Sequence, residues 1–172
     1  LPWDDRHAPW TNVDRAVEAG ELCHMPVMVD FWPRPPERSY EELILRRLRP
    51  GDIHTHVFAQ QHPIILEDGS VNPALFAARR RGVRFDVGHG GGSFWFRNGV
   101  RALEKGFPPD SLSTDLHTGN AANGLVTSIL EVANKYLNMG MGLEEVIERS
   151  TIVPARMIGH GELGHLGIGA AA

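Results

Sequence analysis

Cysteine, long apolar runs and clustered charge are all scarce in this chain of 172 residues. The single cysteine, Cys23, excludes an internal disulfide and favours a reducing compartment, so we expect a cytoplasmic protein. No run of about 18 apolar residues occurs, which predicts no membrane span. No secretory signal peptide is recognisable. The chain begins with Leu1 and not with Met, so we expect its natural N-terminus to lie upstream. The net charge of −4 and the scattered basic residues argue against a nucleic-acid partner.

Histidine, in contrast, is abundant, with nine residues in the chain. Many of these histidines lie beside glycine or aspartate and do not form a stripe on a helix face. This distribution favours a functional site over a role in the core. Apolar residues make up 42% of the sequence, which is enough to bury one hydrophobic core, so we expect a single folding unit.

Four short apolar runs predict buried strands over residues 25–31, 52–58, 83–88 and 111–116. Their starts lie about 30 residues apart, which is typical of repeated strand–helix units. Helical patterns cover residues 12–23, 40–48, 73–81, 96–105, 121–139, 143–150 and 154–158. Ser39 and Asn72 are expected to cap two of these helices. Alternating strands and helices predict an α/β fold with a parallel sheet and right-handed crossovers.

Ionisable side chains occur within or just after each predicted strand: Asp30, His54 and His56, His89, and Asp115 and His117. In a regular strand, the side chains of His54 and His56 would point to the same face. The carboxyl ends of parallel strands gather at one rim, where parallel α/β barrels carry their active sites. Histidine and carboxylate ligands suit zinc or a similar divalent ion. We therefore expect a metal site at this rim, where an ion would activate water.

Each of these residues also has an ordinary structural interpretation. A histidine in a strand is commonly a hydrogen-bonded core residue, and an aspartate at a strand end is commonly a turn former or helix cap. The glycine-rich stretch "GHGGGSF", residues 88–94, suggests a phosphate-binding loop. It lacks the lysine and hydroxyl residue of a P-loop and the spacing of a dinucleotide fingerprint. Close approach of the backbone at Gly90 and Gly91 to a substrate or metal is therefore the preferred interpretation.

Five stretches together resemble the amidohydrolase superfamily, and within it the dihydroorotase-like amidohydrolases and deacetylases. They are "PVMVDF", "LRPGDIHTHVF", "GVRFDVGHGGGSF", "PDSLSTDLHTGN" and "RSTIVPARMIG" with the "GELGHLGIGA" that follows it. The resemblance extends from about residue 11 to the end of the chain. It implies the C-terminal half of a (β/α)8, TIM-like barrel of a metal-dependent hydrolase. Residues 1–160 would hold the equivalents of strands 5–8, and residues 161–172 would begin the return toward a small β-sandwich.

The resemblance also implies roles for individual residues. His56 matches the metal ligand of the sixth strand, and Asp115 matches the aspartate of the eighth strand, which binds metal and moves the proton during catalysis. The remaining matches imply substrate contacts at the rim by His54, His89, Gly90, Gly91 and His117. The cofactor implied is zinc, as one or two divalent ions.

Two departures from the family pattern stand out. The fifth-strand position, which is usually histidine, is occupied by Asp30, which can still bind zinc. No part of the sequence corresponds to the first four strands, which carry a histidine pair and a carboxylated lysine in this family. His54 and His56 could themselves be that histidine pair, but the flanking "LRPGD" fits the sixth strand better. The chain has the size of half a barrel, because a whole one needs about 250 residues.

Two functions follow from this reasoning. The first is metal-dependent hydrolysis of an acyl C–N or C–O bond in a small molecule, by a deacetylase or a cyclic-amidase-like enzyme. The second is a non-catalytic, truncated half-barrel that binds metal weakly and assembles structurally. In both cases the open sheet edges predict a homo-oligomer or pairing with a missing N-terminal half.

Overall fold

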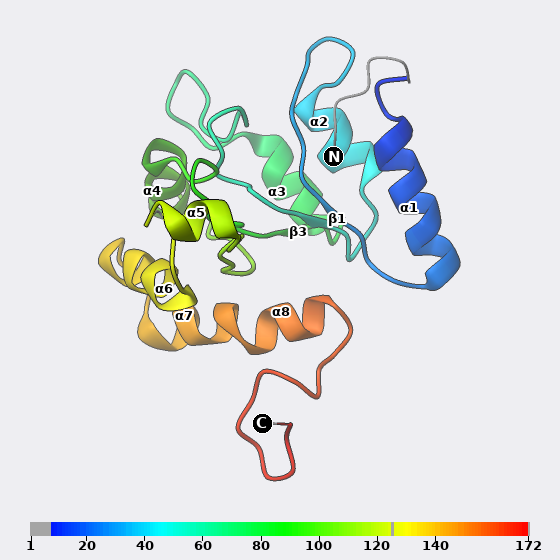
Figure 1. Cartoon of the computed structure of the whole chain (residues 1–172). Coiled ribbons are helices and arrows are strands. Elements are labelled where there is room, and N and C mark those ends of the chain that lie inside the picture. The colour runs from blue at the N-terminus through cyan, green and yellow to red at the C-terminus, as the bar shows by residue number, and fades with distance from the viewer. Residues whose placement is uncertain (1–7, 125, 172) are drawn as a thin grey trace.

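A parallel three-stranded sheet lies at the centre of the computed structural model, which describes residues 8–124 and 126–171 (Figure 1). The strands are β1 (Met28–Val29), β2 (Ile53–His54) and β3 (Arg84–Phe85), in the order β1-β2-β3. Met28 lies opposite Ile53, and Ile53 lies opposite Arg84. The predicted α/β class and parallel pairing are confirmed for these three strands, although each is much shorter than predicted.

The fourth predicted strand, over residues 111–116, is wrong as a regular strand. It is reduced to one parallel bridge between Asp86 and Ser111. Backbone hydrogen bonds nevertheless continue along it, because Val87, His89 and Gly90 donate to the carbonyls of Ser111, Ser113 and Thr114. Regular pairing fails because the adjoining segment contains two left-handed glycines, Gly88 and Gly90, with φ of 46° and 50°.

Helices surround the sheet and account for most of the regular structure. They are α1 (Thr11–Cys23), α2 (Tyr40–Glu42), the π-helix η1 (Leu43–Arg47), α3 (Pro73–Arg80), α4 (Phe96–Glu104), α5 (Thr118–Ala122), α6 (Ile129–Asn138), α7 (Leu143–Ser150) and α8 (Ile152–Met157). The two predicted caps are confirmed: Ser39 Oγ accepts from the Glu42 amide at 3.1 Å, and Asn72 Oδ1 accepts from the Ala74 amide at 3.0 Å. These caps fix where α2 and α3 begin.

The predicted long helix over residues 121–139 is wrong, since the structure divides it into α5 and α6. Gly124 takes a left-handed conformation with φ of 66°, which ends the first helix. The Glu131 carboxylate then accepts hydrogen bonds from the Thr127 amide and hydroxyl at 2.6 and 2.8 Å, which marks the start of the second helix. The predicted helix also includes Leu125, which lies outside the described residues.

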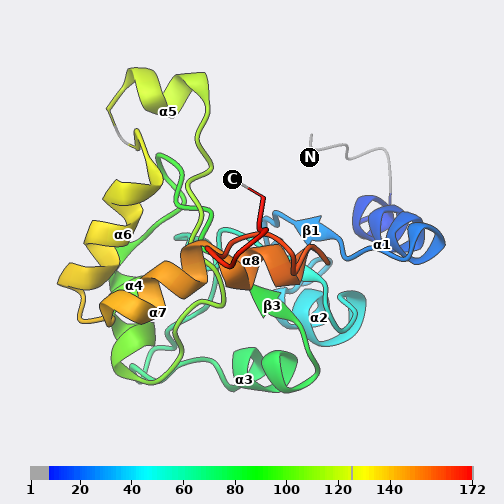
Figure 2. The ribbon, with the colours of Figure 1, turned by 90° about the horizontal axis from the view of Figure 1, so that it is seen from below.

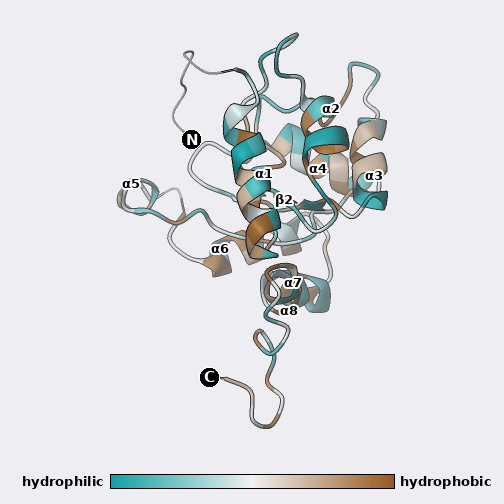
Figure 3. Ribbon diagram, turned by 90° about the vertical axis from the view of Figure 1, so that its right-hand side faces the viewer, coloured by the Kyte–Doolittle hydropathy of each residue, from teal (hydrophilic) through white to brown (hydrophobic). Residues whose placement is uncertain are grey.

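The arrangement leaves two parts of the chain away from the packed body. Helices α7 and α8 run beneath the sheet, and the segment after α8 extends away from it (Figure 1). Helix α5 projects from the body when the molecule is seen from below (Figure 2). Helix α1 carries both hydrophilic and hydrophobic residues, as expected of a helix that covers a core on one side (Figure 3). No helix of the described residues is long and apolar enough to span a membrane.

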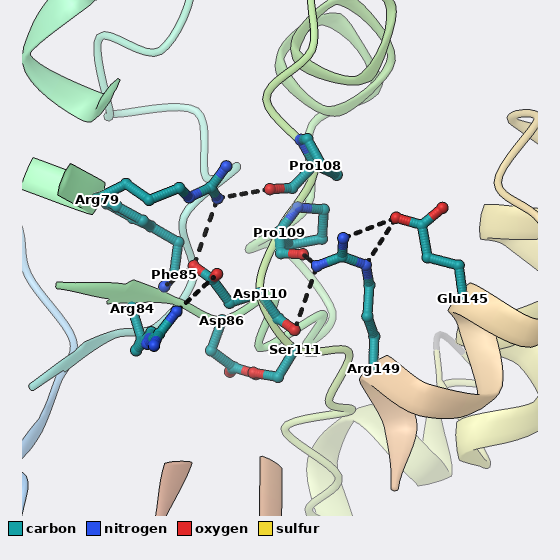
Figure 4. Close-up of polar contacts among 10 residues, drawn as sticks. All are labelled: Arg79, Arg84, Phe85, Asp86, Pro108, Pro109, Asp110, Ser111, Glu145 and Arg149. Atoms are coloured by element: carbon teal, nitrogen blue, oxygen red, sulfur yellow. Dashed lines mark hydrogen bonds and ion pairs between the residues drawn. The ribbon is translucent and has the colours of Figure 1, made fainter. Parts of the chain in front are cut away.

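A polar network joins β3, residues 108–111 and α7 (Figure 4). The Asp110 carboxylate accepts from the Phe85 amide at 2.9 Å and pairs with Arg79 at 3.4 Å and Arg84 at 3.6 Å. On the other side of this segment, the Arg149 guanidinium donates to the Pro109 carbonyl and pairs with Glu145 at 2.7 Å. The network holds the irregular fourth segment beside the sheet without a regular β-ladder.

Replacement of Asp110 tests this network. We expect Asp110→Ala to lower the free energy of unfolding by about 2–3 kcal/mol, because it removes the acceptor of the Phe85 amide and the ion-pair partner of the partly buried Arg79, which keeps its hydrogen bond to the Pro108 carbonyl. Glu145→Ala is the matched control, since Glu145 is a more exposed carboxylate of the same network, and we expect it to cost less than about 0.5 kcal/mol. Urea unfolding of both variants is the measurement, and equal losses would contradict the role given to Asp110.

Candidate active site

His56 lies just beyond β2, and its ring orientation is fixed by a backbone carbonyl. The Nδ1 atom is 2.5 Å from the carbonyl oxygen of Gly88. Because a carbonyl can only accept, Nδ1 carries a ring hydrogen, and Nε2 is the nitrogen that remains to bind a ligand. A hydrogen bond of this kind from the second nitrogen is how metal-binding histidines are commonly oriented.

Asp115 lies near the end of the irregular fourth segment, residues 111–116, and faces His56. Its Oδ2 atom is 3.9 Å from Nε2 of His56, and 43% of its side chain is exposed. The side chain of Asn120 holds the loop after Asp115. Its Nδ2 atom donates to the backbone carbonyl of Asp115 at 2.6 Å, and its Oδ1 atom accepts from the backbone N–H of His117. The strand ends thus bring an imidazole and a carboxylate to one place, separated by 59 positions in the sequence.

Both of these residues have strained backbones. Three non-glycine residues of the described chain have positive φ, and two of them are His56 at 58° and Asp115 at 49°. Left-handed conformations are costly for residues with a Cβ and concentrate at functional sites. The positive φ at His56 also ends the strand alternation, so His54 and His56 do not share surroundings as a regular strand would predict.

Gly90 provides the space that the Asp115 carboxylate occupies. A Cβ at Gly90 would lie 2.8 Å from Oδ2 of Asp115, and Gly90 has a φ of 50°. The glycine is therefore required both by its own conformation and by the approach of its neighbour. The neighbour that the structure places against Gly90 is Asp115, and Gly91 is exposed on the same turn. The approach of Gly90 and Gly91 to a substrate or metal stays a prediction.

Asp86 connects the segments that carry His56 and Asp115. This carboxylate is 2% exposed and accepts hydrogen bonds from the hydroxyls of Thr55 at 2.7 Å, Ser111 at 2.5 Å and Ser113 at 2.7 Å. Thr55 adjoins His56, and Ser113 lies two residues before Asp115. Asp86 was not among the predicted site residues, although the serines and the threonine in the neighbouring strands indicate that a buried carboxylate there would be hydrogen-bonded.

A shared metal ion fits His56 and Asp115 but not a larger set of the described side chains. Zinc bonds to histidine nitrogen and carboxylate oxygen are each about 2.0–2.2 Å long, so atoms 3.9 Å apart can contact one ion. Within residues 8–124 and 126–171, no group of three or more His, Cys, Asp or Glu side chains is arranged to hold a metal. The exposed Asp30 therefore does not complete a three-ligand site with them, and its role as a ligand stays a prediction.

His54 lies in a buried aromatic cluster instead of at the rim. It is fully buried, and its ring centroid is 5.3 Å from that of Tyr40 and 4.8 Å from that of His62. Its Nδ1 atom is 3.2 Å from the Val29 carbonyl, and Nε2 has no hydrogen-bond partner within the described chain. Burial, and secondarily the neighbouring His62, hold the pKa of His54 well below 6.5. In this arrangement His54 presents no surface to a ligand.

His89 and His117 are both engaged within the protein. His117 Nδ1 accepts from the Gly119 amide at 3.1 Å and caps α5. His89 is buried, its Nδ1 is 2.8 Å from the Gly90 carbonyl, and its Nε2 contacts Nζ of Lys135. Burial lowers the pKa of His89, with the nearby lysine charge as a further cause. The substrate contacts predicted for both histidines stay predictions.

Comparison with known proteins finds similar sequences and similar solved structures. No family model matches the chain. A deacetylase of Brucella anthropi is 36% identical over 149 residues, which are 86% of this chain and 36% of that protein. The crystal structure of an adenine deaminase superposes on 95% of this chain and 44% of its own, with a TM-score of 0.86 and 30% identity. The crystal structure of a dihydroorotase covers 86% of this chain and 39% of its own, with a TM-score of 0.68 and 31% identity.

The resemblance to the amidohydrolase superfamily is confirmed. Two of its structural neighbours, the deaminase and the dihydroorotase, are members of that superfamily. The chain spans about a third of the length of the curated relative, whose 36% coverage is well short of the whole protein. The amidohydrolase-like α/β fold is therefore shown, and the activity of any whole protein is a matter for proposal.

Substitution of Gly90 tests the packing of the site. We expect Gly90→Ala to lower the free energy of unfolding by about 1–2 kcal/mol, since it adds a Cβ in a left-handed conformation. Gly92→Ala is the matched control on the same loop, because a Cβ there meets nothing within 4 Å. Chemical denaturation of both variants is the measurement. A Gly90→Ala protein as stable as the Gly92→Ala protein would contradict the close approach to Asp115.

The buried imidazole of His54 predicts acid sensitivity. The folded pKa of His54 is depressed, so below pH 6.5 the unfolded chain binds a proton that the folded chain refuses. The free energy of unfolding should therefore fall as the pH is lowered from about 6.5. We expect His54→Leu to reduce the loss between pH 7.5 and pH 5.5 by about 1 kcal/mol. Urea unfolding at the two pH values is the measurement, and an identical loss in both proteins would refute the assignment.

Proposed function

We propose that the chain forms the strand 5–8 half of a (β/α)8 amidohydrolase barrel, and that its site serves a metal-dependent deacetylase acting on an acyl C–N or C–O bond. The observation that carries this proposal is the 3.9 Å approach of His56 Nε2 to Asp115 Oδ2 from the ends of parallel segments. The deacetylase of Brucella anthropi and the superfamily neighbours support the reaction class.

The two residues have distinct tasks in this proposal. His56 presents the Nε2 lone pair to zinc, while its bond to the Gly88 carbonyl keeps the ring from turning. Asp115 is a second ligand and the proton carrier: it takes a proton from the attacking water and delivers it to the leaving nitrogen or oxygen. Bound zinc, as one ion or two, would polarise the acyl carbonyl and lower the pKa of water.

The substrate we propose is a small molecule with an acylated amine or alcohol. Its acyl carbon must reach Asp115, whose side chain is 43% exposed and therefore accessible. The residue that follows Asp115, Leu116, is apolar and 49% exposed. The predicted homo-oligomer, or pairing with an N-terminal half, would cover the open edge of the sheet at β1.

A non-catalytic half-barrel is the second candidate function. It is favoured by the absence, among the described residues, of any three-ligand group around His56 and Asp115. A zinc ion held by two side chains alone is weakly bound, because structural and catalytic sites use at least three protein ligands. This candidate predicts weak zinc binding without hydrolysis.

Zinc binding and acyl hydrolysis by the same set of variants separate these candidates. We expect Asp115→Asn to abolish hydrolysis in a screen of acetylated amines and alcohols, because an amide cannot carry the proton. His56→Ala should weaken zinc binding at least tenfold, measured by competition with a chelating dye. Asp30→Asn reports whether Asp30 is a further ligand.

His160→Ala is the matched control for the loss of a histidine, since His160 is exposed and pairs only with the nearby Glu162 at 2.8 Å among its described contacts. It should change neither zinc binding nor hydrolysis. Hydrolysis that survives Asp115→Asn would refute the proton-carrying role. Zinc binding without hydrolysis in the wild-type chain would favour the non-catalytic candidate.

A further inference from the structure

Lys135 on α6 reaches across the molecule to the glycine-rich turn beside Asp115. Its Nζ atom contacts Nε2 of His89, 46 positions earlier in the chain. The ammonium also lies 4.9 Å from the ring centroid of Phe94 and 5.0 Å from that of Phe96. The His89 ring stacks on Phe94 with centroids 5.1 Å apart and an interplanar angle of 10°. Two cation–π contacts and one polar contact therefore fix where the ammonium lies.

The two partners of His89 determine where its ring hydrogen lies. The Gly90 carbonyl, 2.8 Å from Nδ1, can only accept, so Nδ1 carries the hydrogen. The ammonium of Lys135 can only donate, so Nε2 carries the lone pair. His89 is thus a neutral ring in one tautomer, with both nitrogens satisfied inside the protein.

This tautomer acts on the turn that borders the carboxylate. The hydrogen bond to the Gly90 carbonyl and the bond from the Gly90 amide to the Thr114 carbonyl at 2.9 Å hold Gly90 from both sides. Gly90 in turn lies so close to Asp115 that a Cβ would be 2.8 Å from Oδ2. If the turn rotated, Gly90 would either clash with the Asp115 carboxylate or lose contact with it.

We propose that Lys135 is a positioning residue for Asp115, which acts by locking His89 in the tautomer that holds Gly90 against the carboxylate. This inference rests on the proposed function for the meaning of Asp115, but the placement of the carboxylate can be tested without any activity. The proposal assigns a role to Lys135, which no sequence motif indicated, and to His89, which was expected to contact substrate. Lys135 itself transfers no proton in this role.

Nuclear magnetic resonance of the histidine rings tests the proposal on the metal-free chain. In the wild-type protein, long-range proton–nitrogen spectra should show His89 with its hydrogen on Nδ1. In Lys135→Met, the ratio of the two tautomers should shift toward Nε2 by about tenfold or more, because the charged donor is lost. The side-chain carboxyl carbon of Asp115 should shift in the same variant.

Three other variants make the test decisive. Lys135→Arg keeps a cationic donor and should retain the wild-type tautomer. Lys105→Met removes the other lysine of the chain, which is exposed at the end of α4, and should leave both signals unchanged. If Lys135→Met does not fold, Lys135→Leu, whose side chain also has no donor, should show the same tautomer shift.

An unchanged His89 tautomer in Lys135→Met, or an Asp115 signal that does not move, would overturn the proposal. Because these signals need neither metal nor substrate, that result would leave the proposed hydrolysis untouched. Conversely, failure of the hydrolase screen with a shifted tautomer would refute the proposed function and keep Lys135 as the residue that places Asp115.

Discussion

The buried carboxylate of Asp86 is the interaction on which the site depends. A buried charge is tolerated only when its oxygens are hydrogen-bonded, and Asp86 meets this need with three hydroxyls, from Thr55, Ser111 and Ser113. These partners come from the segment after β2 and from the irregular fourth segment, which carry His56 and Asp115. Its charge also contributes, after burial itself, to the raised pKa of Tyr136 on α6. One carboxylate thus ties together the elements that form the rim.

Around this connection, the site combines strained and small residues. His56 and Asp115 both adopt left-handed conformations, and Gly88 and Gly90 leave the space that their side chains fill. A Cβ at Gly88 would lie 2.6 Å from Nδ1 of His56, just as one at Gly90 would meet Asp115. Conformations of this cost persist only when the surrounding structure determines them. The glycine-rich turn therefore shapes the pair by packing and has no need of a phosphate-binding role.

Sequence analysis anticipated the parallel sheet, two helix caps and the convergence of strand ends, because these follow from periodicity and local chemistry. It placed His56 and Asp115 at one rim, and their side chains do meet there. Predictions from the sequence were wrong where long-range packing determines the surroundings of a residue. The place of His54 in the alternating strand pattern predicts a position at the rim, yet the rings of Tyr40 and His62 enclose its side chain. Lys135 carries no local signal at all, since its contact with His89 exists only after α6 has packed against the turn. Gly124 ended a helix that apolar periodicity alone would have continued.

The central claim is that His56 and Asp115 hold one ion between them, and anomalous scattering at the zinc absorption edge tests it most directly. In crystals grown with Zn²⁺, the account predicts an anomalous peak within bonding distance of both Nε2 of His56 and Oδ2 of Asp115. Zinc bound to only one of these atoms, or found only elsewhere on the molecule, would contradict it.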